Sequence, residues 1–224
     1  MFNRLISSAL KIFFNLLYHQ FAWAYDWVAD LVSIGRWNAW VNMVLPYLDK
    51  ASVLELGCGP GHLQSAYSIE GGVIFGLDGS WQMLRQANRN LSRNNQANNL
   101  VNGLAQSLPF RDRSFPVVVS TFPSSYIYEA QTLMQVWRVL EDEGQLIILP
   151  AAWITGTSNL DRFASWLFTV AGESPDTDRG NLESTLKLPL ERLSDAGFNT
   201  QYELIESENS SVLMIQAVKI LPRS

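Results

Sequence analysis

The stretch VLELGCGPGH, residues 53–62, decides the fold. It predicts an apolar strand, then a turn with glycine at every second position, then the first residue of a helix. Glycines at alternate positions permit backbone dihedrals that a Cβ would forbid, and they let a ligand lie against the chain. The amides of the turn and the N-terminus of the helix suit a polar ligand group. The stretch therefore predicts a ligand site at the end of a buried strand.

The spacing of the glycines narrows the choice of ligand. A dinucleotide fingerprint G-x-G-x-x-G that starts at Gly57 requires glycine at position 62, which is His62 here. No Gly-Lys-Ser/Thr follows the turn, so the P-loop interpretation fails as well. The turn is therefore neither a dinucleotide motif nor a nucleoside triphosphate motif.

A carboxylate follows at the end of the next apolar run. Asp78 stands twenty-one residues past Gly57 and closes the stretch VIFGLD, residues 73–78. A carboxylate at the end of such a strand can accept charge-assisted hydrogen bonds from both hydroxyls of a ribose. The alternative is a mere tight turn at 57–61, with Asp78 or Ser80 as the N-cap of the next helix. Together, the turn and the carboxylate favour a ligand that contains ribose.

Short apolar runs alternate with helical patterns from residue 51 onward, which is typical of a parallel sheet with crossover helices. Two late strands flank a short polar turn and predict an antiparallel hairpin. The segment 151–187 shows no clear pattern apart from one helix. Strands are expected at 52–56, 73–77, 100–103, 117–121, 145–150, 199–205 and 211–220, and helices at 61–69, 80–93, 129–140, 159–171 and 188–196. The predicted fold class is α/β: a Rossmann-like, mostly parallel sheet of seven strands with a C-terminal antiparallel hairpin and an N-terminal helical cover.

The first 48 residues are expected to form that cover. Apolar residues recur at near-helical spacing between Leu5 and Ala24 and predict an amphipathic helix. The longest uncharged run, 12–25, is shorter than the roughly 20 apolar residues that a membrane-spanning helix needs. Packing on the main domain, a lid over a ligand pocket and docking on a membrane surface stay open as its role. The predicted division is a helical lid or cover, 1–48, and a ligand-binding domain, 49–224.

Composition excludes several classes of function. The chain has 224 residues, of which 47% are hydrophobic and 17% charged, with a formal net charge of −5. Because phosphate backbones are bound by clustered Lys and Arg, nucleic acid is disfavoured as a partner. Cys58 is the one cysteine, so no internal disulfide can form, and no Cys/His cluster has zinc spacing. A cytoplasmic location without a structural metal is expected.

These motifs resemble the class I S-adenosylmethionine (SAM)-dependent methyltransferases, of the methyltransferase type 11 kind. The group that they resemble most is that of the ubiquinone and menaquinone biosynthesis methyltransferases. ELGCGPG, residues 55–61, is similar to the family's first SAM motif, which contacts the methionine part. Asp78 matches the acid that holds the ribose, and DGSWQML, 78–84, resembles D-x-S-x-x-M-L, whose Met83 position packs on the adenine. The resemblance covers most of the chain and implies SAM as cofactor of the domain 49–224.

Two positions depart from the family's pattern. NGLAQSLPF, 102–110, resembles G-D-A-x-x-L-P-F, but Leu104 replaces the Asp that accepts the adenine amino group. This removes one hydrogen bond worth about 0.5–1.5 kcal/mol, while the Ala105 backbone and Gln106 can still touch the ring. Pro116 replaces the Asp of S-F-D, at the first residue of a strand, where proline is tolerated. Neither change abolishes the pocket.

The resemblance also reaches the N-terminal region. YD at 25–26 and SIGRW at 33–37 are similar to a Y-D and S-x-G-x-x-x-W region of the quinone-type enzymes. It implies that Tyr25 lies near SAM and that Arg36 pairs with the methionine carboxylate, unless Arg36 only snorkels from a surface helix. The cofactor-binding residues expected in all are Glu55, Gly57, Cys58, Gly59, Gly61, Asp78, Gly79, Met83, Ala105, Gln106, Thr121, Tyr25 and Arg36.

Methyl transfer is an in-line displacement, so the enzyme mainly aligns donor and acceptor and excludes water. Acceptor-facing residues are expected at 121–126 and in the N-terminal cover. Tyr25, His62 and Tyr126 are candidates for a catalytic role, with packing or a helix-face position as the alternative. Eight tryptophans and eleven phenylalanines indicate an apolar acceptor pocket. The predicted function is SAM-dependent methyl transfer to a small, apolar acceptor. The alternative is a non-catalytic protein of the SAM fold that binds a ligand, a partner or a membrane.

Overall fold

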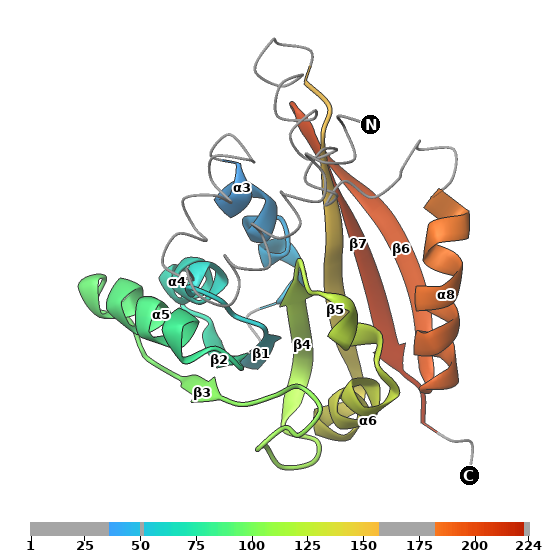
Figure 1. Ribbon diagram of the computed structural model, residues 1–224, viewed down its shortest axis with the longest axis horizontal. Coiled ribbons are helices and arrows are strands. Elements are labelled where there is room, and N and C mark those ends of the chain that lie inside the picture. Colours follow the sequence, from blue (N-terminus) through green and yellow to red (C-terminus); the bar gives the residue numbers. More distant parts are fainter. Residues whose placement is uncertain (1–35, 50–51, 157–181, 222–224) are drawn as a thin grey trace, which may run out of the picture.

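One mixed sheet organises the computed structural model, which describes residues 36–49, 52–156 and 182–221 (Figure 1). Its strand order is β3-β2-β1-β4-β5-β7-β6. β7 runs antiparallel to both of its neighbours, and the pairs formed among β1 to β5 are parallel. The strands are β1 (Ser52–Leu56), β2 (Val73–Asp78), β3 (Leu100–Asn102), β4 (Phe115–Thr121), β5 (Leu140–Ile154), β6 (Phe198–Ser207) and β7 (Ser210–Lys219). The predicted α/β class, with its C-terminal antiparallel hairpin, is confirmed.

Helices cover both faces of this sheet. On one face, Trp40 and Leu63 of α3 and α4 share a core with Val53 of β1. On the other face, α6 and α8 share a core with Leu54 of β1. Neighbouring residues of β1 thus point to opposite cores, which is why the successive residues Val53 and Leu54 are both apolar and buried. The helices are α3 (Trp37–Asn42), η1 (Leu45–Tyr47), α4 (His62–Ile69), α5 (Trp81–Arg93), η2 (Ser125–Tyr128), α6 (Ala130–Val139) and α8 (Leu182–Asp195).

Several elements are longer than the sequence pattern indicates, and because β5 and α8 are two of them, the irregular segment predicted at 151–187 is wrong at both ends. β5 continues to Ile154 because its register against β7 shifts between Ile148 and Ala151, at the position of Pro150. Such a shift lets a strand continue past a residue that has no N–H to donate. α8 begins at Leu182 and holds Pro189 inside it. The helix expected near 159–171 lies outside the described residues.

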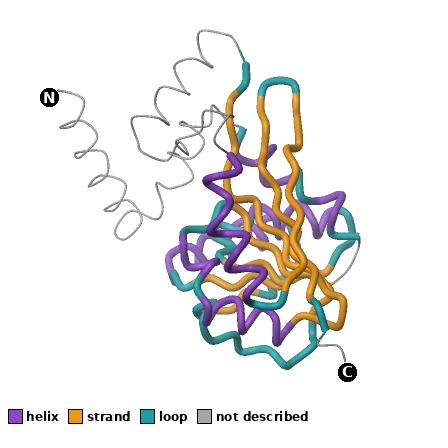
Figure 2. The backbone as a smooth tube through the Cα atoms, turned by 90° about the vertical axis from the view of Figure 1, so that its right-hand side faces the viewer, coloured by secondary structure: helices purple, strands orange, loops and turns teal. Residues whose placement is uncertain are grey.

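The long β6–β7 hairpin rises at one end of the sheet (Figure 2). Its strands pair from Phe198 with Lys219 to Ser207 with Ser210, so the turn is as short and polar as predicted. Along the ranges that the structure describes, no helix is both long and apolar enough to span a bilayer. Most of the N-terminal region 1–48 lies outside these ranges, so its division from 49–224 stays a prediction.

Candidate active site

A pocket of about 330 Å³ opens at the carboxyl ends of β1, β2 and β4. Its volume is within the range of small-molecule sites, and its place is where parallel α/β sheets bind ligands. Segments far apart in the sequence meet there: the glycine turn, the end of β2, the loop after β3, the end of β4, η2 and α3. The lining residues are Trp37, Val41, Glu55, Gly57, Cys58, Gly59, Pro60, His62, Leu63, Leu77, Asp78, Gly79, Ser80, Met83, Gly103, Leu104, Ala105, Gln106, Thr121, Phe122, Pro123, Ser124 and Tyr126.

The turn after β1 uses its glycines for different reasons. Gly57, Gly59 and Gly61 have φ values of +72°, +51° and +83°, which side chains rarely adopt. A Cβ on Gly57 would lie 2.6 Å from the Tyr126 hydroxyl, whereas a Cβ on Gly59 would meet no atom within 4 Å. Gly57 therefore makes room for a neighbour, and Gly59 leaves its backbone open to the pocket. Gly61 packs against Ala87 and does not line the pocket.

The carboxylate of Asp78 ties β2 to the glycine turn. Its Oδ2 accepts the N–H of Gly59 at 2.9 Å, and its Oδ1 accepts the N–H of Ser80 at 2.7 Å. Burial raises its pKa, while these two amide hydrogen bonds act in the opposite direction. An ionised carboxylate has about four acceptor positions, so two remain for a ligand. The N-cap of α5 is Ser80, whose hydroxyl accepts the N–H of Met83.

A second carboxyl group, Glu55, lies buried beneath the turn. Its Oε2 accepts Nε2 of Gln64 at 2.6 Å, and its Oε1 accepts the hydroxyl of Thr121 at 3.0 Å. Burial raises the pKa of Glu55 to about 8, more than its two hydrogen bonds lower it. Gln64 Oε1 is buried without a partner in the described part of the chain. The side chain of Glu55 still borders the pocket, so a cationic ligand group there would favour its ionised form.

The candidates for a catalytic role differ in what the structure shows of them. The Tyr126 hydroxyl donates to Leu56 O at 3.1 Å and lies 3.2 Å from the hydroxyl of Ser120. Burial raises the pKa of Tyr126, so this phenol braces the end of β1 and is a poor proton acceptor. His62, at the start of α4, is half-buried and lines the pocket. Tyr25 lies outside the described residues.

Arg36 is not among the residues that line the pocket. Its guanidinium Nη1 lies 3.5 Å from the carbonyl oxygen of Asn209, in the turn between β6 and β7. The other predicted cofactor-binding residues of the described chain, apart from Gly61, all line the pocket. The structure therefore brings together segments that the sequence could only propose one at a time.

An aromatic wall closes the pocket beside β4. Phe122 has a φ of +50°, which is uncommon for a bulky residue, and its N–H donates to Leu149 O at 2.7 Å. Its ring lies 4.7 Å from the ring of Trp37 and 6.3 Å from that of Trp40, measured between centroids. Val41 and Leu63, which the sequence analysis missed, extend this apolar lining. Their apolar helical positions carried no signal that separates a pocket wall from ordinary core.

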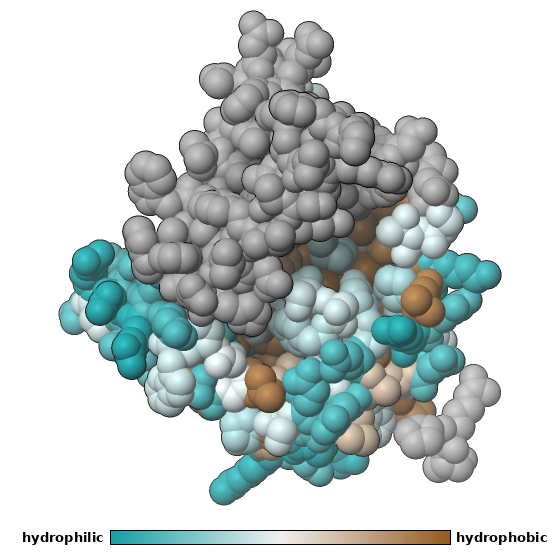
Figure 3. Space-filling model, in the orientation of Figure 1, coloured by the Kyte–Doolittle hydropathy of each residue, from teal (hydrophilic) through white to brown (hydrophobic). Residues whose placement is uncertain are grey.

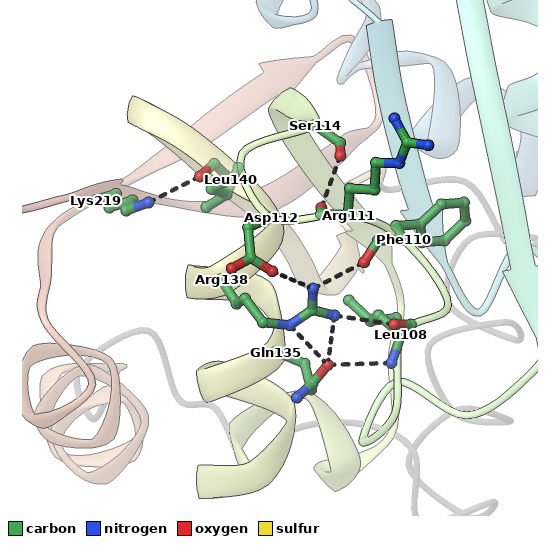
Figure 4. Close-up of polar contacts among 9 residues, drawn as sticks. All are labelled: Leu108, Phe110, Arg111, Asp112, Ser114, Gln135, Arg138, Leu140 and Lys219. Carbon is green, nitrogen blue, oxygen red and sulfur yellow. Dashed lines mark hydrogen bonds and ion pairs between the residues drawn. The ribbon is translucent and has the colours of Figure 1, made fainter.

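Arg138 of α6 fixes the loop that leads away from the pocket (Figure 4). Its guanidinium donates to the carbonyl oxygens of Leu108 at 2.9 Å and Phe110 at 2.8 Å. It also donates to Asp112 at 2.7 Å and to Gln135, whose Oε1 accepts the N–H of Leu108 as well. The planar guanidinium suits several acceptors at once. Residues 108–112 are thus held against α6, directly after the pocket residues Ala105 and Gln106.

A metal site would require at least three His, Cys, Asp or Glu side chains that lie together. No such cluster occurs in residues 36–49, 52–156 and 182–221. Cys58 is buried, and burial raises the pKa of its thiol well above the ordinary value. The polar groups of the pocket are backbone amides, two carboxyls, hydroxyls, the Gln106 amide and the His62 imidazole, which suit an organic ligand.

Known proteins share this arrangement. Residues 53–144 match a family described as "Methyltransferase domain". A demethylmenaquinone methyltransferase of Lactobacillus johnsonii is 32% identical over 142 residues, which cover 59% of this chain and 58% of that protein. The chain therefore spans less than two thirds of the length of this curated relative.

Solved structures agree at the level of the fold. A Methanococcus maripaludis protein assigned to the S-adenosyl-L-methionine-dependent methyltransferases has a TM-score of 0.63 at 19% identity, covering 91% of this chain and 93% of that one. A geranyl diphosphate methyltransferase has a TM-score of 0.58 at 13% identity, covering 81% and 78%. Residues 53–144 thus resemble a methyltransferase domain in sequence, and the chain shares its fold with solved structures described as SAM-dependent methyltransferases.

Proposed function

We propose that this chain binds SAM in the 330 Å³ pocket and transfers its methyl group to a small, apolar acceptor. The observation that carries the proposal is the meeting of the glycine turn with Asp78, where the Gly59 amide lies 2.9 Å from the carboxylate. Backbone without side chains and a carboxylate with spare acceptor positions face the same space. That combination suits a ligand with a ribose and a charged amino-acid part.

The pocket residues suit the parts of SAM. Asp78 would accept hydrogen bonds from the ribose hydroxyls, and the turn at 57–61 with Glu55 would hold the methionine part. Met83, Ala105 and Gln106 would flank the adenine; the Gln106 amide is held by Glu129 at 2.8 Å. The remaining proposed contacts are Cys58, Gly79 and Thr121, which line the pocket, and Tyr25.

Methyl transfer depends on the alignment of donor and acceptor and on the exclusion of water more than on a catalytic group. SAM supplies a methyl group on a sulfonium that is already activated as a leaving group. The wall of Trp37, Val41, Leu63 and Phe122 would exclude water and receive an apolar acceptor. A relative in sequence is named for demethylmenaquinone and a relative in fold for geranyl diphosphate. Both of these molecules carry an apolar isoprenoid chain, which supports an acceptor with an apolar part. We propose the N-terminal region 1–48, which includes Trp37 and Val41, as the cover of this site.

Of the described candidates, His62 is the better one for a general base, should the acceptor lose a proton. Tyr126 already donates its proton to Leu56 O, and its pKa is raised. His62 lines the pocket at the start of α4. A non-catalytic role for the chain is not favoured, because the family and the relatives that it matches in sequence are described as methyltransferases.

Calorimetric titration with SAM and with its demethylated product tests the pocket. Asp78→Ala is expected to weaken both by about 10- to 100-fold, since it removes hydrogen bonds to a charged acceptor. Asp195→Ala, at an exposed site on α8, is the matched control and should bind as the parent does. If the parent chain binds neither compound at millimolar concentration, the proposal is wrong. Mass spectrometry of isoprenoid and quinone acceptors after incubation with SAM then tests the transfer.

A further inference from the structure

Charge is unevenly distributed along this chain. Residues 79–111 contain four arginines and no Asp, Glu or Lys, although the whole chain has a net charge of −5. Three of these arginines, Arg85, Arg89 and Arg93, recur every fourth residue on α5 and are all exposed. Trp81, the first residue of the helix, begins the same series and is 61% exposed. Residues four apart are neighbours on a helix surface, so these four side chains form one strip, the α5 stripe.

The α5 stripe has no anionic partner in the described chain. In the described chain, ion pairs are formed by Arg113, Arg138 and Lys219, and none of these three residues lies on α5. Like charges four residues apart weaken a helix slightly, and here no carboxylate offsets that repulsion. The opposite face of α5 is buried through Met83, Leu84, Ala87 and Leu91. In the space-filling view, the left edge of the molecule, where Figure 1 places α5, is accordingly hydrophilic (Figure 3).

Exposed apolar groups lie at the pocket end of this stripe. Leu104 lines the pocket and is 63% exposed. A Cβ on Gly79 would lie 3.1 Å from Leu104 Cδ2, so Leu104 sits over the residue two positions before Trp81. The stripe therefore leads from three guanidinium groups to Trp81, which follows the pocket residue Ser80 and lies two positions from Gly79, the residue that Leu104 covers.

We propose that the α5 stripe docks this chain on an anionic phospholipid surface, with Trp81 and Leu104 at the interface. Guanidinium groups pair with headgroup phosphates, and tryptophan favours the headgroup level of a bilayer. A nucleic acid fits less well, because it needs a broader basic face and offers no apolar layer for Trp81 and Leu104. A bilayer needs only a local basic strip with apolar anchors.

Docking would bring the pocket mouth to the lipid. The pocket is lined by Ser80 and Met83, at the N-terminal end of α5, and by Leu104. An acceptor dissolved in the bilayer would then enter without crossing bulk water; this consequence, unlike the docking itself, rests on the proposed function. The α5 stripe would thus bring the chain to the membrane that holds the acceptor, and the pocket would carry out the methyl transfer.

Co-sedimentation of the full chain with vesicles tests the docking. Binding is expected on vesicles of phosphatidylcholine with 30% phosphatidylglycerol and to be weak on phosphatidylcholine alone. At about five-fold per arginine, the variant Arg85→Gln/Arg89→Gln/Arg93→Gln should lower the partition coefficient by about 100-fold. The control Arg113→Gln/Lys187→Gln/Arg192→Gln removes the same charge from exposed sites on other segments and should change it by less than about three-fold. Trp81→Ser should weaken binding several-fold on its own.

Three results would overturn the docking: no preference for anionic vesicles, equal losses in the stripe and control variants, or tighter stripe-dependent binding to a labelled 20-nucleotide RNA than to vesicles. Circular dichroism checks that each variant is folded. Titration with the demethylated product of SAM separates the two proposals. A stripe variant that binds this product but not vesicles supports the docking, whereas a parent chain that binds vesicles but not the product overturns the proposed function alone.

Discussion

Replacing Arg138 by methionine removes five hydrogen bonds and keeps a side chain of similar length. The side chain of Arg138 is 28% exposed, and that of its ion-pair partner Asp112 is 73% exposed, so the ion pair itself contributes at most about 1 kcal/mol. The bonds to the carbonyl oxygens of Leu108 and Phe110 come from a charged donor and are worth about 1.5 kcal/mol each. Arg138→Met should therefore lower the free energy of unfolding by about 2–4 kcal/mol.

Urea unfolding, followed by circular dichroism, measures this loss. Arg113→Met is the matched control, since Arg113 pairs with Asp142 while its side chain is 64% exposed; it should cost less than about 1 kcal/mol. Arg138→Lys should recover only part of the loss, because an ammonium cannot serve several fixed acceptors in one plane. A loss below about 0.5 kcal/mol for Arg138→Met would refute the reasoning, since the observed hydrogen bonds would then stabilise nothing.

Other perturbations test the site itself. The pKa of Glu55 is raised from its ordinary value of 4.5 to about 8 in the folded chain. The folded state therefore binds the proton more tightly, and stability should fall as pH rises from about 4.5 to 8. Glu55→Gln should flatten this slope in urea unfolding, and an unchanged slope would contradict the assignment. Gly57→Ala should lower the free energy of unfolding by about 1–3 kcal/mol, because the new Cβ would lie 2.6 Å from the Tyr126 hydroxyl at a φ of +72°. Tyr126→Phe in the same chain should restore part of this loss. No restoration would show that the clash is not the cause. The Phe122→Gly variant should be more stable than the Phe122→Ala variant by about 1 kcal/mol in thermal unfolding. Both variants lose the ring, but only glycine accepts a φ of +50° without strain. The reverse order of stability would rule out strain at this residue.

The sequence predicted the strands best where both faces are buried. β1 has the predicted bounds, because three of its five residues are apolar, four are buried, and a glycine turn ends it. β5 and α8 were predicted too short because each contains a proline inside its range, Pro150 and Pro189. Local propensity counts proline as a breaker, whereas pairing with β7 and packing on the sheet outweigh it.

The candidate site likewise contains residues that the sequence could predict and contacts that it could not. Asp78 and the glycines carry a local signal, since their spacing in the sequence reflects one strand, one turn and the next strand. The contacts of Glu55 with Thr121 and of Arg138 with Leu108 span 66 and 30 residues. Such pairs depend on how the strands are ordered across the sheet, and no local pattern encodes that order. The backbone of Phe122 is likewise set by its hydrogen bond to β5 and by the rings around it.

The position of β7 has a consequence for synthesis. β7 follows β6 in the sequence, yet it lies between β5 and β6 in the sheet and is the strand with which β6 pairs. While the ribosome is still making residues 210–219, the edge of β5 is therefore open to other strands, and β6 cannot yet pair with β7. The nascent chain must keep that edge from aggregating until β7 emerges and inserts between the two.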